Sequence, residues 1–256
     1  MRSNGDTSPP PDDTQEPDFE PSYDDPQEPV LEPPTDVTES SAPSQEKAPK
    51  TAPPTKGPTL SVRVVLLTYG ALLVVAIGWG WLTHGPNVFF LPASETLAAT
   101  RVLRIPGLPA WAFRYGGALV VGLTLGLVVV GASRLGVRYS NGLRGMQEAF
   151  ASTLGEMSGA QVWVAAVASA VAEEALFRGA MLPTIGIWWS SAVFGILHTP
   201  MERRMRLWPV MAFVMGVGFA LSAMAFGHLL APMVAHFTIN FLNLKEISRE
   251  ATRLKR

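Results

Sequence analysis

Apolar residues form long blocks after residue 59 and are scarce before it. Leu60–Leu82 is a run of about 23 residues in which Arg63 is the only charge, and Ala110–Ala132 is a second run of similar length. Because a helix rises about 1.5 Å per residue, each run is long enough to cross a hydrocarbon core of about 30 Å. Both runs are therefore predicted to span a membrane.

Four further apolar blocks raise the predicted number of spans to six. They are Ala160–Leu182, Trp188–Thr199, Leu207–Ala225 and Leu229–Leu244. The second of them is short for a helix that crosses a bilayer, and Gly186 precedes it as a turn signal. The predicted fold class is all-α, a polytopic transmembrane bundle of about six spans.

One segment between the apolar blocks has a different pattern. In residues 140–158, the apolar residues Leu143, Met146, Phe150 and Leu154 recur at intervals of three and four. This spacing places them on one face of a helix. We expect an amphipathic helix that lies in the membrane interface.

Charge divides the chain at the same place as hydropathy. Residues 1–59 contain 13 Asp and Glu against 4 Lys and Arg, together with 14 of the 22 prolines, whereas residues 60–256 contain 8 acidic and 16 basic residues. The formal net charge of −1 therefore combines a net of −9 with a net of +8. These differences predict a disordered, acidic, Pro-rich tail over residues 1–59 and a membrane domain over residues 60–256.

Composition also excludes several classes of protein. The chain has no cysteine, which excludes disulfides, a thiolate nucleophile and Cys-ligated metals. A nucleic-acid partner is not expected, because the basic residues are spaced between apolar runs of membrane length. With six spans, fifteen basic residues fall on one side of the membrane and about four on the other. We therefore expect both termini in the cytoplasm, in a bacterial inner or plasma membrane.

Three of the predicted spans carry polar side chains, which are costly inside a membrane and usually functional. Glu173 and His198 each lie about 12 residues from a turn near Ile185–Gly186, and therefore at a similar depth of about 18 Å. Folding could bring the two helices beside this turn together with the last span. Their polar residues would then form one group: Glu173, Glu174, Arg178, His198, His236 and Asn240.

The spacing of these residues suits the hydrolysis of an amide by an activated water. Glu174 and Arg178 are four residues apart and can form an ion pair, whereas Glu173 projects about 100° away and remains free for chemistry. A buried carboxylate beside an imidazole can take a proton from water. A second imidazole and an amide can stabilise the resulting oxyanion. Ser169 lies one turn before Glu173, but no Gly-x-Ser-x-Gly motif supports a serine nucleophile.

Other interpretations use the same residues. His198, His236 and a glutamate could form a His₂Glu zinc site, although no His-Glu-x-x-His motif is present. The charged residues could also form a structural network, or a proton relay in a transporter, although the repeated halves typical of transporters are not seen. A non-catalytic binding or immunity protein is a third alternative. His84 and His228 are expected to be incidental.

Three sequence motifs resemble those of the CPBP family. These are Glu173-Glu174-x-x-x-Arg178, Phe194-x-x-x-His198 and His236-x-x-x-Asn240, and the resemblance covers about residues 160–244. The family comprises type II CAAX prenyl endopeptidases and bacteriocin-processing or Abi-type relatives, which are glutamic intramembrane proteases.

The resemblance implies a role for each motif residue. It implies Glu173 as the base that activates water, with His198 assisting. It implies His236 and Asn240 as the pair that stabilises the oxyanion, and the remaining motif residues as supports of the site: Glu174, Arg178 and Phe194. It also implies catalysis without a metal or other cofactor, and a bundle of mostly eight membrane helices, two more than predicted here.

The substrate implied is a membrane-embedded or membrane-anchored protein or peptide. A prenylated tail, a bacteriocin leader and a C-terminal sorting tail all remain open.

Overall fold

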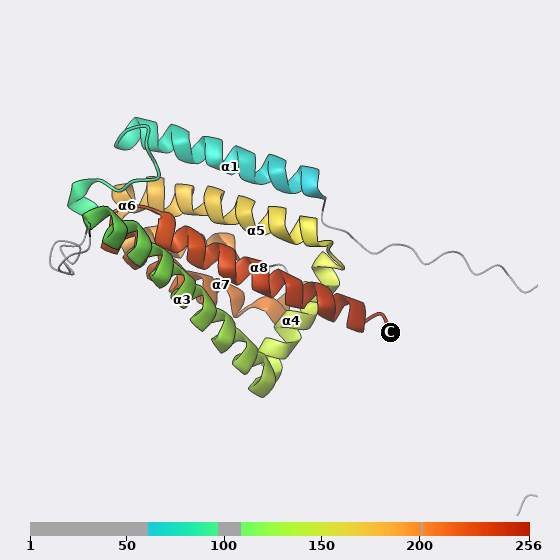
Figure 1. Ribbon diagram of the computed structural model, residues 1–256. Coiled ribbons are helices and arrows are strands. Elements are labelled where there is room, and N and C mark those ends of the chain that lie inside the picture. Colours follow the sequence, from blue (N-terminus) through green and yellow to red (C-terminus); the bar gives the residue numbers. More distant parts are fainter. Residues whose placement is uncertain (1–60, 97–108, 201) are drawn as a thin grey trace, which may run out of the picture. The chain divides into compact units, whose positions relative to one another are not determined.

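The computed structural model describes residues 61–96, 109–200 and 202–256, all of which belong to one compact unit, Ala52–Arg256. This part of the chain is built from helices (Figure 1). They are α1 (Val62–Thr83), α3 (Ala110–Tyr139), α4 (Asn141–Leu154), α5 (Gly159–Glu174), a π-helix (Ala175–Met181), α6 (Leu182–Leu197), α7 (Trp208–Phe226) and α8 (Leu230–Arg253). Two short 3-10 turns, Ala93–Glu95 and Arg203–Met205, complete them. The tail predicted over residues 1–59 lies outside the described residues.

Four helical segments of the described chain, rather than the six expected, are long and apolar enough to cross a membrane. They are Val62–Thr83, Ala110–Tyr139, Gly159–Leu197 and Arg203–Phe226. The difference has two causes. Two of the expected spans belong to one helical run, Gly159–Leu197, and α8 carries many polar side chains along its length. The chain is thus a multi-pass membrane protein by the length and composition of its helices.

The run from α5 to α6 reverses direction at Gly186. Within α6 this residue has φ 79° and ψ 171°, a conformation that essentially only glycine adopts readily. A straight helix would place Glu173 and His198 almost 40 Å apart, yet their side chains approach to 3.7 Å. The turn expected near Ile185–Gly186 is therefore present, and it folds the two motifs against each other.

Helix α5 lies between α1 and α8, and α8 lies between α5 and α3 (Figure 1). Three contacts fix an antiparallel register between α5 and α8. Ser248 Oγ accepts a hydrogen bond from Met157 N at 2.8 Å, Asn240 Nδ2 donates to Ser169 Oγ at 2.8 Å, and His236 Nδ1 contacts Glu174 Oε1 at 2.7 Å.

Helix α8 continues beyond the expected end of its span at Leu244 and reaches Arg253. Asn240 thus lies 13 residues, about 20 Å, from the end of its helix. Glu173 lies 14 residues, about 21 Å, from the start of α5. Measured from the start of α5 and the end of α8, Glu173 and Asn240 therefore lie at a similar distance along the two antiparallel helices.

Small residues on α3 allow close packing against α8. Ala118, Gly122, Gly126 and Val130 recur every four residues along α3, and all four are buried. A Cβ at position 122 would lie 2.5 Å from the carbonyl oxygen of Ala231. Helices in membranes commonly associate through such small residues.

Helix α4 occupies the amphipathic segment predicted over residues 140–158. Ser140 caps its start by accepting a hydrogen bond from Leu143 N at 3.4 Å. Its apolar side packs toward α7 and α8, with Met146 buried beside Trp208 and Met211. The predicted amphipathic helix is therefore present and packs its apolar side on neighbouring helices, and its position in the membrane interface stays a prediction.

Candidate active site

A buried ion network holds the end of α5 against α8. The Glu174 carboxylate is 0% exposed and lies 3.0 Å from Arg178 Nη1, four residues later along the chain. The same oxygen, Oε1, lies 2.7 Å from His236 Nδ1. Glu174 thus joins two helices, and the ion pair expected between Glu174 and Arg178 is present.

Three phenylalanine rings surround the Arg178 guanidinium, which is 1% exposed. Its central carbon lies 4.4 Å from the ring centre of Phe194, 5.2 Å from that of Phe219 and 5.7 Å from that of Phe177. Cation–π attraction of this kind strengthens away from water. Phe194, expected to support the site, therefore stabilises the buried charge next to Glu174.

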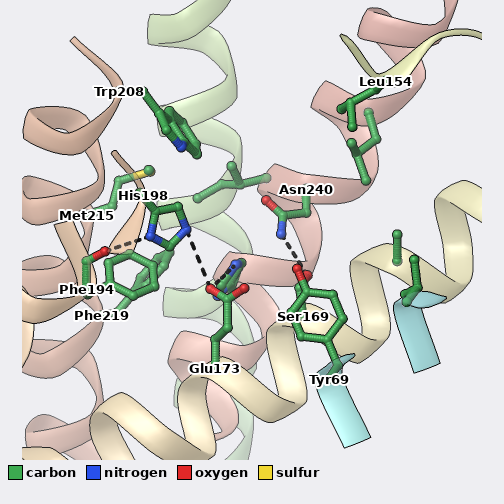
Figure 2. Close-up of a pocket in the computed structure, with 15 residues that line it drawn as sticks. Tyr69, Leu154, Ser169, Glu173, Phe194, His198, Trp208, Met215, Phe219 and Asn240 are labelled. Carbon is green, nitrogen blue, oxygen red and sulfur yellow. Dashed lines mark hydrogen bonds and ion pairs between the residues drawn. The ribbon is translucent and has the colours of Figure 1, made fainter. Parts of the chain in front are cut away.

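Glu173 projects in a different direction from Glu174 and lies near two histidines, one of which, His198, is shown beside it in Figure 2. Its Oε2 atom lies 3.7 Å from Nε2 of His198 and 3.8 Å from Nε2 of His236. These separations are too long for direct hydrogen bonds, and the described residues give the buried Oε2 no hydrogen-bond partner. Three polar atoms from three helices therefore converge on one small space.

The other ring nitrogens determine what these histidines present to Glu173. Nδ1 of His198 lies 2.6 Å from the carbonyl oxygen of Phe194, which can only accept, so this nitrogen carries the proton. Nδ1 of His236 likewise donates to the carboxylate of Glu174. In the neutral form, each Nε2 thus offers a lone pair toward Glu173.

Asn240 completes the group from one turn further along α8. Its Nδ2 donates to Ser169 Oγ at 2.8 Å (Figure 2). That hydroxyl in turn donates to the Ala166 carbonyl oxygen at 3.2 Å. Ser169 therefore holds the Asn240 amide in place, and one of the two N–H groups remains for another acceptor. This contact gives Ser169 a positioning role, which differs from that of a nucleophile.

These side chains line a cavity of about 260 Å³. Its wall includes all four residues expected to be catalytic, namely Glu173, His198, His236 and Asn240, together with the mainly apolar side chains of Val65, Leu154, Ala165, Trp208, Met215, Ile239 and Leu244. The sequence motifs thus come together in one place.

Tyr69 is a residue of the site that the sequence analysis missed. It lines the cavity from α1, together with Glu173 and Ser169 (Figure 2). A phenol inside an otherwise apolar predicted span was the available signal. No sequence motif connects α1 to the other helices, so only folding reveals this position.

Within the described ranges, no set of three or more His, Cys, Asp or Glu side chains is arranged to hold a metal ion. His228, in the turn before α8, is 2% exposed, and its ring stacks on that of Tyr115 with the ring centres 4.8 Å apart. Burial and the nearby Arg114 lower the pKa of His228, so its ring is neutral and packs as an aromatic.

Comparison with known proteins covers the same part of the chain. Residues 156–242 match the family described as "Type II CAAX prenyl endopeptidase Rce1-like". A protein of Bacillus subtilis (strain 168), described as "Uncharacterized protein YpbD", is 37% identical over 86 residues, which are 33% of this chain and 44% of that protein. The chain thus spans less than half the length of this curated relative. No solved structure matches.

Proposed function

We propose that this chain, whose residues 156–242 form a type II CAAX prenyl endopeptidase Rce1-like domain, is a glutamate-dependent intramembrane endopeptidase. The observation that carries the proposal is the position of the Glu173 carboxylate, 3.7 Å and 3.8 Å from two imidazoles in a cavity that Asn240 also lines. This set of groups suits the hydrolysis of a peptide bond by water.

In the proposed reaction, a water molecule bridges Glu173 Oε2 and His198 Nε2. The carboxylate takes one proton as the water oxygen bonds to the carbonyl carbon of the substrate. The C–N bond then breaks, and the proton passes from Glu173 to the leaving nitrogen. The products are a carboxylic acid and an amine, and no covalent enzyme intermediate forms.

His236 and Asn240 are proposed to stabilise the negative oxygen that this attack creates. The Asn240 amide can donate its remaining N–H. His236 can donate from Nε2 when both ring nitrogens carry protons, while Nδ1 donates to the Glu174 carboxylate. Glu174, Arg178 and Phe194 orient His236 and do not contact the reacting atoms.

The proposed substrate is a protein or peptide in or on the membrane. The cavity wall is largely apolar and lies among helices of membrane length. An apolar peptide segment close to a membrane fits such a wall better than a soluble, charged one. CAAX-type tails, bacteriocin leaders and C-terminal sorting tails all meet this description.

The test replaces Glu173 with glutamine in the native host, because Gln preserves size and removes the base. Membrane and secreted proteomes of wild-type and Glu173→Gln strains are compared by mass spectrometry of new protein termini. We expect specific termini to disappear in the mutant. Glu202→Gln, at a carboxylate beyond α6 and outside the cavity, is the matched control and is expected to leave them unchanged.

If the termini persist while the Glu173→Gln protein is expressed and inserted normally, the proposal is wrong. A non-catalytic binding protein or a proton-coupled transporter would then be the better explanation of the polar residues.

A further inference from the structure

A second hollow, of about 150 Å³, adjoins the catalytic cavity and is bounded by α3, α4, α7 and α8. We call it the side hollow. Six residues line both spaces and so form the wall between them: Leu154, Trp208, Met215, Ile239, Asn240 and Leu244. Figure 2 shows Leu154, Trp208 and Asn240 at the edge of the catalytic cavity. A substrate held at Asn240 therefore lies next to the side hollow.

The side hollow, rather than contact with the membrane, explains why one face of α4 is apolar. Leu143, Met146, Phe150 and Leu154, the four apolar residues that define the amphipathic pattern, all line it. Of these four residues, only Leu154 also lines the catalytic cavity. An apolar helix face that surrounds a hollow beside an active site suits an apolar part of the substrate.

Size and chemistry narrow the choice of occupant. An apolar cavity of about 150 Å³ in another protein is large enough to bind benzene, so this volume suits one ring or one branched side chain. It is too small for an extended lipid chain. Most of the wall is apolar, and three methionines, Met146, Met211 and Met215, contribute to it. The polar residues of the wall are Ser133, Arg134, Gln147, Asn240, Asn243 and Glu246. Methionine adapts its shape to its neighbours, which allows the hollow to accept Leu, Met or Phe.

We propose that the side hollow binds one large apolar side chain of the substrate, at a residue within two positions of the bond that is cut. This inference rests on the proposed function. An extended peptide advances about 3.3 Å per residue. A substrate residue within two positions of the carbonyl group held at Asn240 can therefore reach the side hollow with its side chain.

The first test measures binding and does not need catalysis. Full-length Glu173→Gln protein in detergent micelles is heated with N-acetyl-phenylalaninamide or with N-acetyl-alaninamide. We expect the phenylalanine probe to raise Tm by about 3 °C and the alanine probe to have no effect. Adding Met211→Phe, which fills the side hollow, removes the shift. Met211→Ala, which enlarges it, retains the shift.

Met224→Phe is the matched control, because Met224 packs against a separate cluster around Leu182 and Ala220. It is expected to retain the response to the phenylalanine probe. Equal shifts with both probes, or a shift that survives Met211→Phe, would overturn the inference.

The second test reads the sequences around each cleavage that depends on Glu173. In the wild type, we expect large apolar residues to be enriched about tenfold at one position near the cut. Met211→Phe shifts this preference to Ala and Val. An unchanged preference contradicts the inference even if total cleavage falls. If no cleavage depends on Glu173, the proposed function fails, and the binding test still decides the inference.

Discussion

At the scale of single residues, the site depends on the different surroundings of two adjacent glutamates. Consecutive helical residues project about 100° apart. Glu174 therefore lies among Arg178, His236 and the phenylalanines, whereas Glu173 reaches the cavity. The buried Glu174 is already engaged by a cation and an imidazole. Among the described residues, Glu173 Oε2 is buried and has no hydrogen-bond partner, and in the proposed reaction this oxygen takes the proton of the water.

Tyr69→Phe tests whether α1 contributes to the proposed reaction. The phenol lines the same cavity as the Glu173 carboxylate, and a hydrogen bond formed between them during the reaction would be worth about 1.5–3 kcal/mol. We expect kcat to fall about 10- to 100-fold with little change in KM, because the ring still fills the cavity wall. Steady-state kinetics on a cleaved peptide, once identified, provide the measurement.

Tyr115→Phe is the control for this change, because Tyr115 stacks on His228 away from the cavity. It is expected to leave kcat and KM unchanged. A Tyr69→Phe protein with wild-type kcat would show that the phenol has no part in positioning Glu173.

At the scale of helices, close packing of α3 on α8 positions His236 and Asn240. A Cβ at position 126 would lie 2.7 Å from Thr238 Cβ and 3.0 Å from the Ala235 carbonyl oxygen. Both of these residues flank His236 on α8. The glycines of α3 thus allow the approach of the helix that carries the last sequence motif.

Gly126→Ala is expected to destabilise the folded protein by about 1–3 kcal/mol, because the added methyl group overlaps α8. On the same helix, Gly131 has no atom within 4 Å of an added Cβ. Gly131→Ala should instead be neutral or stabilising by up to about 1 kcal/mol, since alanine favours a helix. Thermal unfolding of both variants in detergent measures the difference. Equal Tm values would contradict the importance of the close contact.

At the scale of the whole molecule, the basic residues still predict that both ends of the chain lie in the cytoplasm. The absence of native cysteine allows a direct test, because one introduced cysteine is the only thiol. In intact cells, a membrane-impermeant maleimide should label Ser94→Cys, in the exposed segment after α1. It should not label Ser44→Cys or Arg256→Cys until the cells are opened. Labelling of either end in intact cells would overturn the predicted orientation.

Much of the candidate site could be predicted from the sequence. Its polar residues lie within apolar runs, where the free-energy cost of a polar side chain in a membrane indicates a function. Intervals of four residues place pairs of them on the same helix face. The turn at Gly186 was also predictable, because a glycine follows Pro183 between two apolar blocks. The number of spans was not predictable. Apolar length alone cannot distinguish one helical run that reverses direction from two helices that each cross the membrane, and it cannot show that α8 continues past Leu244.

The sequence by itself thus determined the class of the protein, its helical segments and the residues at its centre, because hydropathy and helical periodicity are local properties of the chain. Only the tertiary structure decided which surfaces meet. It placed Tyr69 of α1 in the same cavity as Glu173, made Ser169 the support of Asn240 and turned the apolar face of α4 toward the side hollow. These contacts join residues far apart in sequence, and they depend on the packing of whole helices, which no local pattern encodes.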